Sequence, residues 1–587
     1  MNRLSFRQIR KTIARSTRTL LNAFLAASLL LGLIPPPLVT TVADLTGFRN
    51  LSGLADILPE LSVAEAAPLE APASVGDIAP AFAPSLQTST ITGSVFRDYD
   101  VDGTKDANEP FLIDVSSVTV TAYDASSSAV GTTTVSTTDG SYTLNVTGSG
   151  PFRLEFTGLP PWLKDGVVGS GSASTVQFAN DGDTINLAVH NPVDYCQAEP
   201  PLTVACYLQP LDATATAWTD EPAIVQIPYE SGTTATDTTA IDTVEDEAFK
   251  TILATNGEVG SVFGLAFDQG EGIIYTSAFM KRHVPYGPAG VDAIYKIDGT
   301  GVSTFMNLNA LLGGTPAGAD EHSPNGNNYQ EDDVWDAVGK SSFAGLAISQ
   351  DGSTLYVVTM TDADRQLYKI NVPADGTNPL AADVQSFALP SPADCPAHPS
   401  TGGGELNHNL RPGALEYSDG TLYVGLTCTA ESTQSTADLK GYVYAFDPTN
   451  DTFASTPLLT IPFNYSRTNV TSNPVVAPGA FNPWTTVQMT FATSPALNGR
   501  DDNASYPMPW LMDIGFADDG CMVLGIADRF GHLSSGRNSP PEQLNGNAGG
   551  DILKACNLAG SWTLENNGND GVNPATAGAG TNAGPGN

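Results

Sequence analysis

Apolar and polar residues alternate along several short stretches of this chain. Such alternation over about four to eight residues is typical of half-buried β-strands. Residues 90–96 and 117–123 follow the pattern, and strand-like segments recur from about residue 255 onward. The sequence therefore predicts an all-β protein.

The run between the first two predicted strands has the pattern of a calcium-binding loop. Acidic residues stand at positions 1, 3, 5, 9 and 12 of the run and Gly103 at position 6, which is the D-x-D-x-D-G-x5-E pattern. Calcium binds about six to eight oxygen atoms, and the glycine allows the chain to coil around the ion. The alternative is a solvated acidic loop. The expected Ca²⁺ ligands are Asp98, Asp100, Asp102, Thr104 through its carbonyl, Asp106 and Glu109.

Residues 93–100, 118–123 and 137–144, taken with this loop, resemble an SdrD B-like domain, a module related to the Cna B-type repeats of bacterial surface proteins. The resemblance covers about residues 89–190. It implies an Ig-like β-sandwich that serves as a stalk or spacer and is made rigid by calcium. Cna B-type domains often carry a Lys–Asn isopeptide bond, but the first predicted strand has no lysine and Lys105 lies in the loop. We therefore expect calcium, and not an isopeptide bond, to stabilise the module.

A loose repeat follows the sandwich segment. Its four copies start at Gly264, Gly345, Gly413 and Asp513, and each has the order strand, Asp-Gly-type turn, strand, loop, strand. This order is typical of β-propeller blades. The copies lie further apart than compact blades of about 40–50 residues, so we expect either long surface insertions or intervening strands that are too degenerate to recognise.

This repeat region resembles NHL- and gluconolactonase-like propellers, and the propeller portions of large SdrD B-containing surface proteins. Four copies are few for a closed ring. We therefore expect an incomplete domain in a chain that is part of a longer protein.

The N-terminal leader has basic residues followed by about 14 apolar ones, which is too short for a membrane span and typical of an export signal. No later segment is long and apolar enough to cross a membrane. The expected segments are an export signal (1–43), a flexible lead-in (44–88), the sandwich (89–190), a connector (191–254), the propeller-like domain (255–567) and a Gly/Asn-rich tail (568–587).

Charge and cysteine content refine this picture. Acidic residues outnumber basic ones by 63 to 25, for a net charge of −38, which disfavours nucleic acid and anionic membranes as partners. An even number of cysteines in an exported chain indicates disulfides. The simplest pairing joins neighbours in the sequence: Cys196–Cys206, Cys395–Cys428 and Cys521–Cys556.

Enzymatic motifs are weak. An acidic, amide-rich insertion could bind a metal ion, with a solvated loop as the alternative; its polar residues are Asp320, Glu321, His322, Asn325, Asn327, Glu331, Asp332 and Asp333. Asp528 and Arg529 follow a predicted strand and favour a structural role. Trp335, Trp484 and Trp510 are expected to pack between blades and not to stack on sugars.

Two functions remain. The first is a secreted or cell-surface, adhesin-like and non-enzymatic protein, in which the calcium-stabilised sandwich carries a propeller-like domain that binds an extracellular protein or glycan. The alternative is a secreted, metal-dependent, lactonase-like hydrolase that works from the propeller channel.

Overall fold

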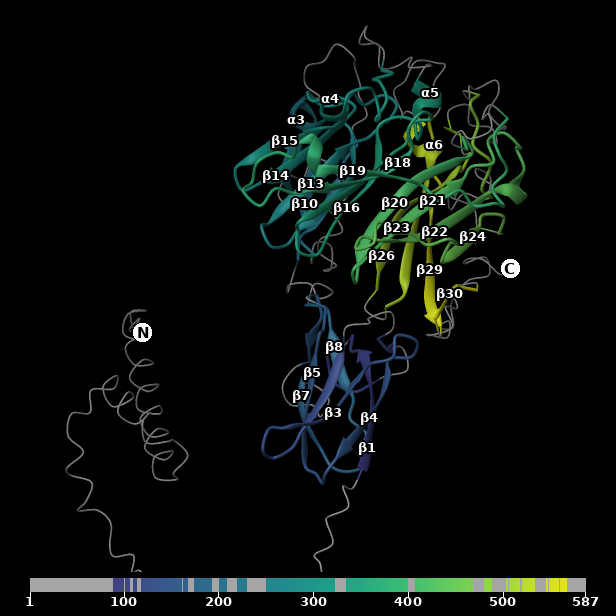
Figure 1. Ribbon diagram of the computed structural model, residues 1–587. Coiled ribbons are helices and arrows are strands. Elements are labelled where there is room, and N and C mark those ends of the chain that lie inside the picture. Colours follow the sequence, from purple (N-terminus) through teal and green to yellow (C-terminus); the bar gives the residue numbers. More distant parts are fainter. Residues whose placement is uncertain are drawn as a thin grey trace, which may run out of the picture. The chain divides into compact units, whose positions relative to one another are not determined.

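The described part of the chain is built from strands with very few helical turns, so the predicted all-β class is confirmed (Figure 1). The computed structural model describes residues 88–99, 101–105, 109–112, 118–160, 162–166, 174–192, 200–207, 219–229, 250–322, 334–399, 407–465, 467, 480–487, 503–504, 506–517, 520–533, 545–546, 548–558 and 560–566. The predicted export signal, almost all of the lead-in and the predicted tail lie outside these residues.

Residues 88–190 form a β-sandwich of two four-stranded sheets, with strand orders β4-β1-β8-β6 and β3-β2-β5-β7. Strand β1 pairs antiparallel with β4 and parallel with β8. The strands are β1 (Thr88–Arg97), β2 (Thr119–Tyr123), β3 (Ala129–Thr134), β4 (Ser141–Thr147), β5 (Phe152–Thr157), β6 (Lys164–Asp165), β7 (Val176–Ala179) and β8 (Leu187–His190).

The core of this sandwich follows from the alternation in the sequence. In β4, Tyr142, Leu144 and Val146 are buried while the residues between them are exposed. Phe152 and Leu154 of β5 are buried in the same way. These side chains belong to one hydrophobic cluster between the two sheets, since successive side chains of a strand point to opposite faces.

The predicted connector contains a three-stranded antiparallel sheet of order β11-β10-β9. The strands are β9 (Leu202–Ala205), β10 (Pro222–Ile227) and β11 (Thr251–Thr255). Ile224 and Ala254 are buried in the same cluster as the next domain, and β9 and β11 contact that domain's first sheet. The segment therefore packs as a sheet against the repeat region.

Four antiparallel sheets follow, and their strands are hydrogen-bonded in chain order, except that β24 of the third sheet pairs with β22. The sheets are β12 (Val262–Asp268), β13 (Ile273–Ala278), β14 (Ala293–Asp298) and β15 (Gly301–Asn307); β16 (Phe343–Ile348), β17 (Thr354–Thr359), β18 (Gln366–Asn371) and β19 (Val384–Ala388); β20 (Leu410–Ser418), β21 (Thr421–Cys428), β22 (Lys440–Asp447), β23 (Thr452–Phe453) and β24 (Leu459–Pro462); and β26 (Pro509–Phe516), β27 (Met522–Asp528), β29 (Asp551–Leu558) and β30 (Ser561–Leu564). A small parallel pair joins β25 (Asn503–Ala504) to β28 (Asn545–Gly546).

The first strands of these sheets, β12, β16, β20 and β26, are called the inner strands, because consecutive ones pack against each other: β12 against β16, β16 against β20 and β20 against β26. Three of them carry a glycine at the contact. A Cβ atom on Gly264 would lie 2.8 Å from Leu346 Cβ, one on Gly345 would lie 2.6 Å from Gly413 O, and one on Gly413 would lie 1.9 Å from Leu511 O. Side chains would keep the sheets apart at these points.

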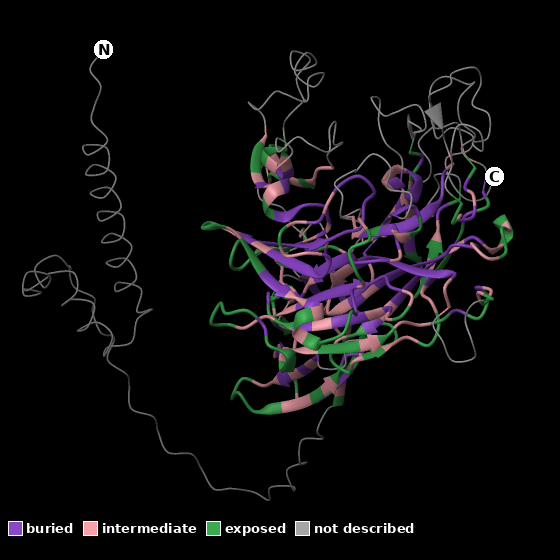
Figure 2. Ribbon diagram, turned by 90° about the horizontal axis from the view of Figure 1, so that it is seen from above, coloured by how far each residue is buried: buried purple, intermediate pink, exposed green. Residues whose placement is uncertain are grey.

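Each sheet also repeats the same irregularity. The pairing between the inner strand and the second strand shifts register once in every sheet, next to the contact with the neighbouring sheet. A bulge of this kind increases the local twist of a strand. Figure 2 shows that the strands of this region are mostly buried, whereas the exposed residues concentrate in the connecting turns.

A second repeated contact closes the end of each sheet. In each sheet, the residue directly after the second strand donates its backbone N–H to the backbone carbonyl of the residue directly before the inner strand. The four bonds are Phe279 N to Ser261 O (3.0 Å), Met360 N to Ser342 O (3.1 Å), Thr429 N to Asn409 O (2.7 Å) and Arg529 N to Met508 O (2.9 Å). The four copies seen in the sequence are therefore four versions of one structural unit.

Two of the three predicted disulfides are confirmed, Cys395–Cys428 and Cys521–Cys556. The second one links neighbouring strands β27 and β29, next to the pair Met522 and Ala555. Cys206 forms no disulfide within the described residues, and Cys196 lies outside them, so the predicted Cys196–Cys206 bond stays a prediction.

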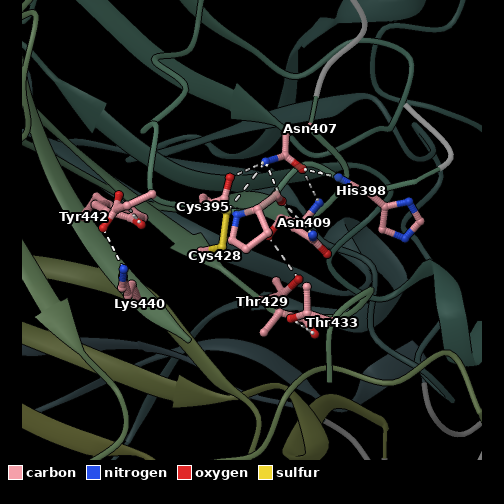
Figure 3. The surroundings of a disulfide bond; sticks show 12 residues. Cys395, His398, Asn407, Asn409, Cys428, Thr429, Thr433, Lys440 and Tyr442 are labelled. Carbon is pink, nitrogen blue, oxygen red and sulfur yellow. Dashed lines mark hydrogen bonds and ion pairs between the residues drawn. A yellow bond between two sulfur atoms is a disulfide. The ribbon is translucent and has the colours of Figure 1, made fainter. Parts of the chain in front are cut away.

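The Cys395–Cys428 bond anchors the segment that leads into β20. Figure 3 shows Asn407 beside this disulfide: its Nδ2 donates to Cys395 O (3.3 Å) and Pro396 O (3.1 Å), and its Oδ1 accepts from the backbone N–H of His398 (3.1 Å). The disulfide and this one amide together fix the entry to the third inner strand.

Within the described residues, helical structure is limited to single turns. In the described part of the chain, no helix has the length and apolar character needed to span a bilayer. The short helices are α3 (Asn256–Val259), α4 (Leu308–Leu312), α5 (Val334–Ala337), α6 (Arg529–Leu533), η4 (Ala381–Asp383) and η5 (Thr436–Asp438).

The contact between inner strands predicts the effect of adding one methyl group. Gly413→Ala should destabilise the protein by about 2–3 kcal/mol, because the new Cβ would collide with Leu511 O. Gly515→Ala is the matched control, since Gly515 lies in β26 with no atom within 4 Å of its Cβ position; its effect should stay within about 0.5 kcal/mol. Urea unfolding followed by tryptophan fluorescence measures both, and equal stability of the two variants would contradict the close approach.

Candidate functional site

The predicted calcium loop coils around Asp98, the residue that follows β1. The Asp98 carboxylate accepts hydrogen bonds from the backbone N–H groups of Asp102 (3.1 Å) and Gly103 (2.8 Å). The turn is possible because Val101 and Gly103 adopt left-handed backbone angles, with φ of 59° and 78°. Asp98 is fully buried.

The other end of the loop returns to the same place. Glu109 Oε1 accepts a hydrogen bond from the backbone N–H of Tyr99 (2.8 Å), and Glu109 is buried. Lys105 donates from Nζ to the carbonyl oxygen of Glu109 and lies 4.5 Å from the ring centre of Phe111. The first and last predicted ligands are therefore brought together.

Residues 101–105 in the middle of the loop are described. Asp102 is exposed, and its Oδ1 accepts a hydrogen bond from Thr104 N (2.6 Å). Asp100 and Asp106 lie outside the described residues. A search of the described residues finds no group of three or more His, Cys, Asp or Glu side chains that could hold a metal ion. The carboxylate and carbonyl oxygens that the structure does place here are of the kind that suits a hard cation.

The loop adjoins a contact with the third sheet of the repeat region. Arg97, one residue before Asp98, pairs with Asp419 (2.8 Å) in the β20–β21 turn, and Asn191 also donates to Asp419 Oδ1 (3.1 Å). Tyr99 packs on the β26–β27 turn, where a Cβ on Gly520 would lie 2.1 Å from its hydroxyl oxygen. The residues on both sides of Asp98 thus contact the second half of the chain.

Of the acidic insertion, only Asp320, Glu321 and His322 are described. His322 Nδ1 lies 2.7 Å from Asp320 Oδ1, and its Nε2 lies 3.1 Å from Lys281 O. The imidazole therefore ties this segment to the loop after β13. The other predicted residues of the insertion lie outside the described residues.

Asp528 and Arg529 act as hydrogen-bond centres. Asp528 accepts bonds from the backbone N–H groups of Met508, Phe530 and Gly549, at 2.8, 2.9 and 2.8 Å. Arg529 donates to the carbonyl oxygens of Val338, Trp335 and Thr485. These bonds support the structural role expected from the sequence.

The tryptophans predicted to pack between blades are buried. Trp484 and Trp510 have no exposed surface, and Trp335 is 2% exposed. The indole N–H groups of Trp484 and Trp510 donate to backbone carbonyls of Pro509 and Pro412. Stacking on a sugar is thereby excluded for these three side chains.

The structure reveals a cavity that the sequence patterns did not indicate. It has a volume of about 980 Å³ and is lined by all four inner strands together with β27 and β29. Apolar side chains such as Phe263, Leu265 and Met512 form most of its wall. The charged residues among its described lining are Glu416, Asp513 and Asp551.

Two of these acids replace apolar residues of the repeat. Directly after the register shift, the first three inner strands carry leucine (Leu265, Leu346, Leu415), whereas the fourth carries Asp513. At the next position, Ala266 and Ala347 correspond to Glu416. An alignment of the four copies would have shown both acids at positions where the other copies have apolar residues. Without such an alignment, they cannot be distinguished from the many other acidic residues of the chain.

The cavity alters the acidity of both groups. Burial, and to a lesser extent the nearby charge of Asp513, raises the pKa of Glu416 to about 8. Burial also raises the pKa of Asp513. Asp551 differs because it is paired: Arg467 lies 3.2 Å away and the Tyr465 hydroxyl donates to it at 2.7 Å.

No family model matches the sequence. Colossin-A of Dictyostelium discoideum is 28% identical over 502 residues, which is 83% of this chain but only 4% of Colossin-A. Colossin-B of the same organism is 25% identical over 84% of this chain and 12% of its own length. Colossin-D is 26% identical over 64% of this chain and 34% of its own. The chain thus spans a minor part of each of these relatives.

Likenesses among solved structures are weak. An auxiliary nutrient binding protein from Bacteroides thetaiotaomicron matches 76% of this chain and 75% of its own at 10% identity, with a TM-score of 0.26. The nidogen/laminin complex matches 56% of this chain and 95% of that chain at 12% identity, with a TM-score of 0.24. At these scores the likenesses carry no argument about fold or function.

The ion pair beside the loop makes a prediction that a double-mutant cycle can test. Arg97 is 5% exposed, so its coupling with Asp419, measured with Arg97→Gln and Asp419→Asn, should be about 1–3 kcal/mol. The pair Arg153–Glu155 within the sandwich, in which both side chains are about one third exposed, is the control and should couple by less than about 1 kcal/mol. Equal coupling in the two pairs would show that the contact does not form in solution.

Proposed function

We propose that this chain is a secreted or cell-surface modular protein, in which a calcium-stabilised, SdrD B-like sandwich positions a propeller-like binding domain. The observation that carries the proposal is the loop at Asp98: its carboxylate organises the coil, Glu109 returns to its start, and Arg97 and Tyr99 contact the repeat region. A cation in this loop would stabilise the sandwich and its contact with the second half together.

The calcium assignment is supported by the residues that the structure places. Asp98 and Glu109 lie close together and are buried, and Asp102 and the Thr104 carbonyl lie between them in the sequence. Calcium, when bound, supplies positive charge that offsets the repulsion between these acids. At millimolar calcium and a dissociation constant of about 10⁻⁴ M, binding would stabilise the module by roughly 1–2 kcal/mol.

The Ig-like and propeller-like descriptions are part of the proposal. Two sheets that enclose one core support the first. The second is supported by four antiparallel sheets in chain order, whose inner strands pack in succession through Gly264, Gly345 and Gly413. Sheets in a propeller bury their faces against neighbouring sheets in this manner. The two confirmed disulfides are typical of an oxidising, extracellular environment.

A metal-dependent, lactonase-like hydrolase is the second candidate. It is favoured by one observation, the cavity between the inner strands with its two acids, Glu416 and Asp513. Turnover that requires a divalent cation and stops in Glu416→Gln would favour the hydrolase. Adhesion without turnover, to a protein or glycan, would favour the first proposal.

Calcium should raise the melting temperature of the full chain, and the double variant Asp98→Ala, Asp102→Ala should lose this rise. The reason is that Asp98 organises the coil and Asp102 supplies an exposed oxygen. Differential scanning calorimetry with calcium and with EDTA measures the shift, which should be several degrees for a gain of about 1–2 kcal/mol.

Asp124→Asn is the control for this experiment. Asp124 is a half-exposed turn residue of the same sandwich that accepts hydrogen bonds from Ser126 and Ser128. Its calcium response should equal that of the unmodified chain. A calcium-dependent rise that persists in the double loop variant would refute the assignment.

A further inference from the structure

We propose that the cavity between the inner strands binds a small organic cation, a primary amine carried on an apolar chain, with its ammonium group held by Glu416 and Asp513. This inference rests on the proposed function only in treating the repeat region as a binding domain, and it does not depend on the calcium loop.

The size and apolar walls of the cavity indicate the apolar part of the ligand. A volume of about 980 Å³ is at the upper end of the range of small-molecule sites, which is about 300–1,000 Å³. Phe263, Leu265, Leu346, Leu415 and Met512 line it. Such walls favour a ligand with an aliphatic or aromatic body, because both surfaces leave water on binding.

The two acids, Glu416 and Asp513, indicate the cationic part of the ligand. Glu416 is half-buried, Asp513 is a solvent-exposed residue that lines the cavity, and no basic side chain of the described residues pairs with either carboxyl group. Asp513 accepts a backbone hydrogen bond from Ile514, and its Cβ occupies the space above Gly525. A carboxylate in an apolar surrounding is disfavoured unless a cation or a proton neutralises it.

The third acid of the lining is already neutralised. Arg467 and Tyr465 both bind Asp551. The other walls, from β12 and β16, contribute Phe263, Gly264, Leu265, Gly345 and Leu346 and hence no titratable group to the described lining. Among the described lining, the acidic groups without a basic partner are therefore Glu416 and Asp513.

A divalent metal ion fits this arrangement poorly. Calcium requires about six to eight oxygen ligands, and the cavity offers two free carboxyl groups among apolar side chains. An ammonium group needs only a few hydrogen-bond acceptors, and its three N–H donors can bind both acids. The combination of apolar walls and two neighbouring acids thus favours an amphipathic amine.

Binding should be coupled to proton release. Burial raises the pKa of Glu416 to about 8, so this group is mostly protonated at pH 7. An ammonium ion favours the ionised form and lowers the pKa of Glu416, so a proton leaves as the ligand binds. The affinity should therefore rise as the pH increases from 6 to 8.5, where an alkylamine with a pKa of about 10.5 stays charged.

The test is isothermal titration calorimetry of the full chain with n-hexylamine at pH 7, in two buffers of different ionisation enthalpy. We expect one binding site, release of nearly one proton, and affinity at least about tenfold higher than for n-hexanol. Glu416→Gln and Asp513→Asn should each weaken hexylamine binding by about tenfold or more. Glu271→Gln, an exposed acid in the β12–β13 turn, should leave it unchanged.

Three outcomes would overturn the proposal. Equal affinity for hexanol would mean that the cavity recognises apolar ligands without regard to charge. Unchanged binding in Glu416→Gln and Asp513→Asn would place the amine elsewhere, and displacement of the amine by one equivalent of calcium would indicate a metal site. Hexylamine binding should persist in the Asp98→Ala, Asp102→Ala variant, so failure of the calcium proposal and failure of this one can be told apart.

Discussion

The close approach of consecutive inner strands is the constraint on which the second half of the chain depends. Backbones meet backbones at Gly264, Gly345 and Gly413, and a side chain at any of these positions would occupy space held by the next sheet. The register shift beside each contact adds local twist, which lets one sheet turn away from its neighbour. In the fourth sheet, Gly525 of β27 is paired with Asp513 of β26, and its missing side chain leaves room for the Asp513 Cβ. The geometry that packs the sheets therefore also directs the side chains after each shift into the cavity.

Much of the fold could be predicted because burial in strands alternates. The alternation in residues 141–147 is visible in the sequence, and the repeated glycines mark the inner strands. The sheet formed by β9, β10 and β11 could not be predicted, because the segment is rich in Thr and Asp and its strands are separated by long stretches. Its burial depends on contacts with β12 and β15, which lie far away in the sequence. Tertiary contacts of this kind override the local pattern.

The loop and the cavity differ in how well the sequence indicates them. The ligands of a calcium loop are spaced within twelve consecutive residues, so the spacing alone singles out Asp98 and Glu109. Glu416 and Asp513 come from different sheets and meet only because β20 packs against β26. In a chain with 63 acidic residues, two more acids in strands attract no attention until the repeat is aligned.

The loop at Asp98 and the cavity with Glu416 and Asp513 differ in the groups that surround their acidic side chains. Around Asp98 the backbone turns its N–H groups toward the carboxylate, and the loop supplies further oxygens at short range. Such a site suits a compact, hard cation. The described lining of the cavity that holds Glu416 is mostly apolar, and it contains two further acids, Asp513 and Asp551, and no basic side chain. A proton or a cation with an apolar body compensates charge there. On these two proposals, one acidic chain would bind two classes of cation at separate sites. Backbone N–H donors surround the carboxylate of Asp98, whereas mostly apolar side chains line the cavity of Glu416 and Asp513.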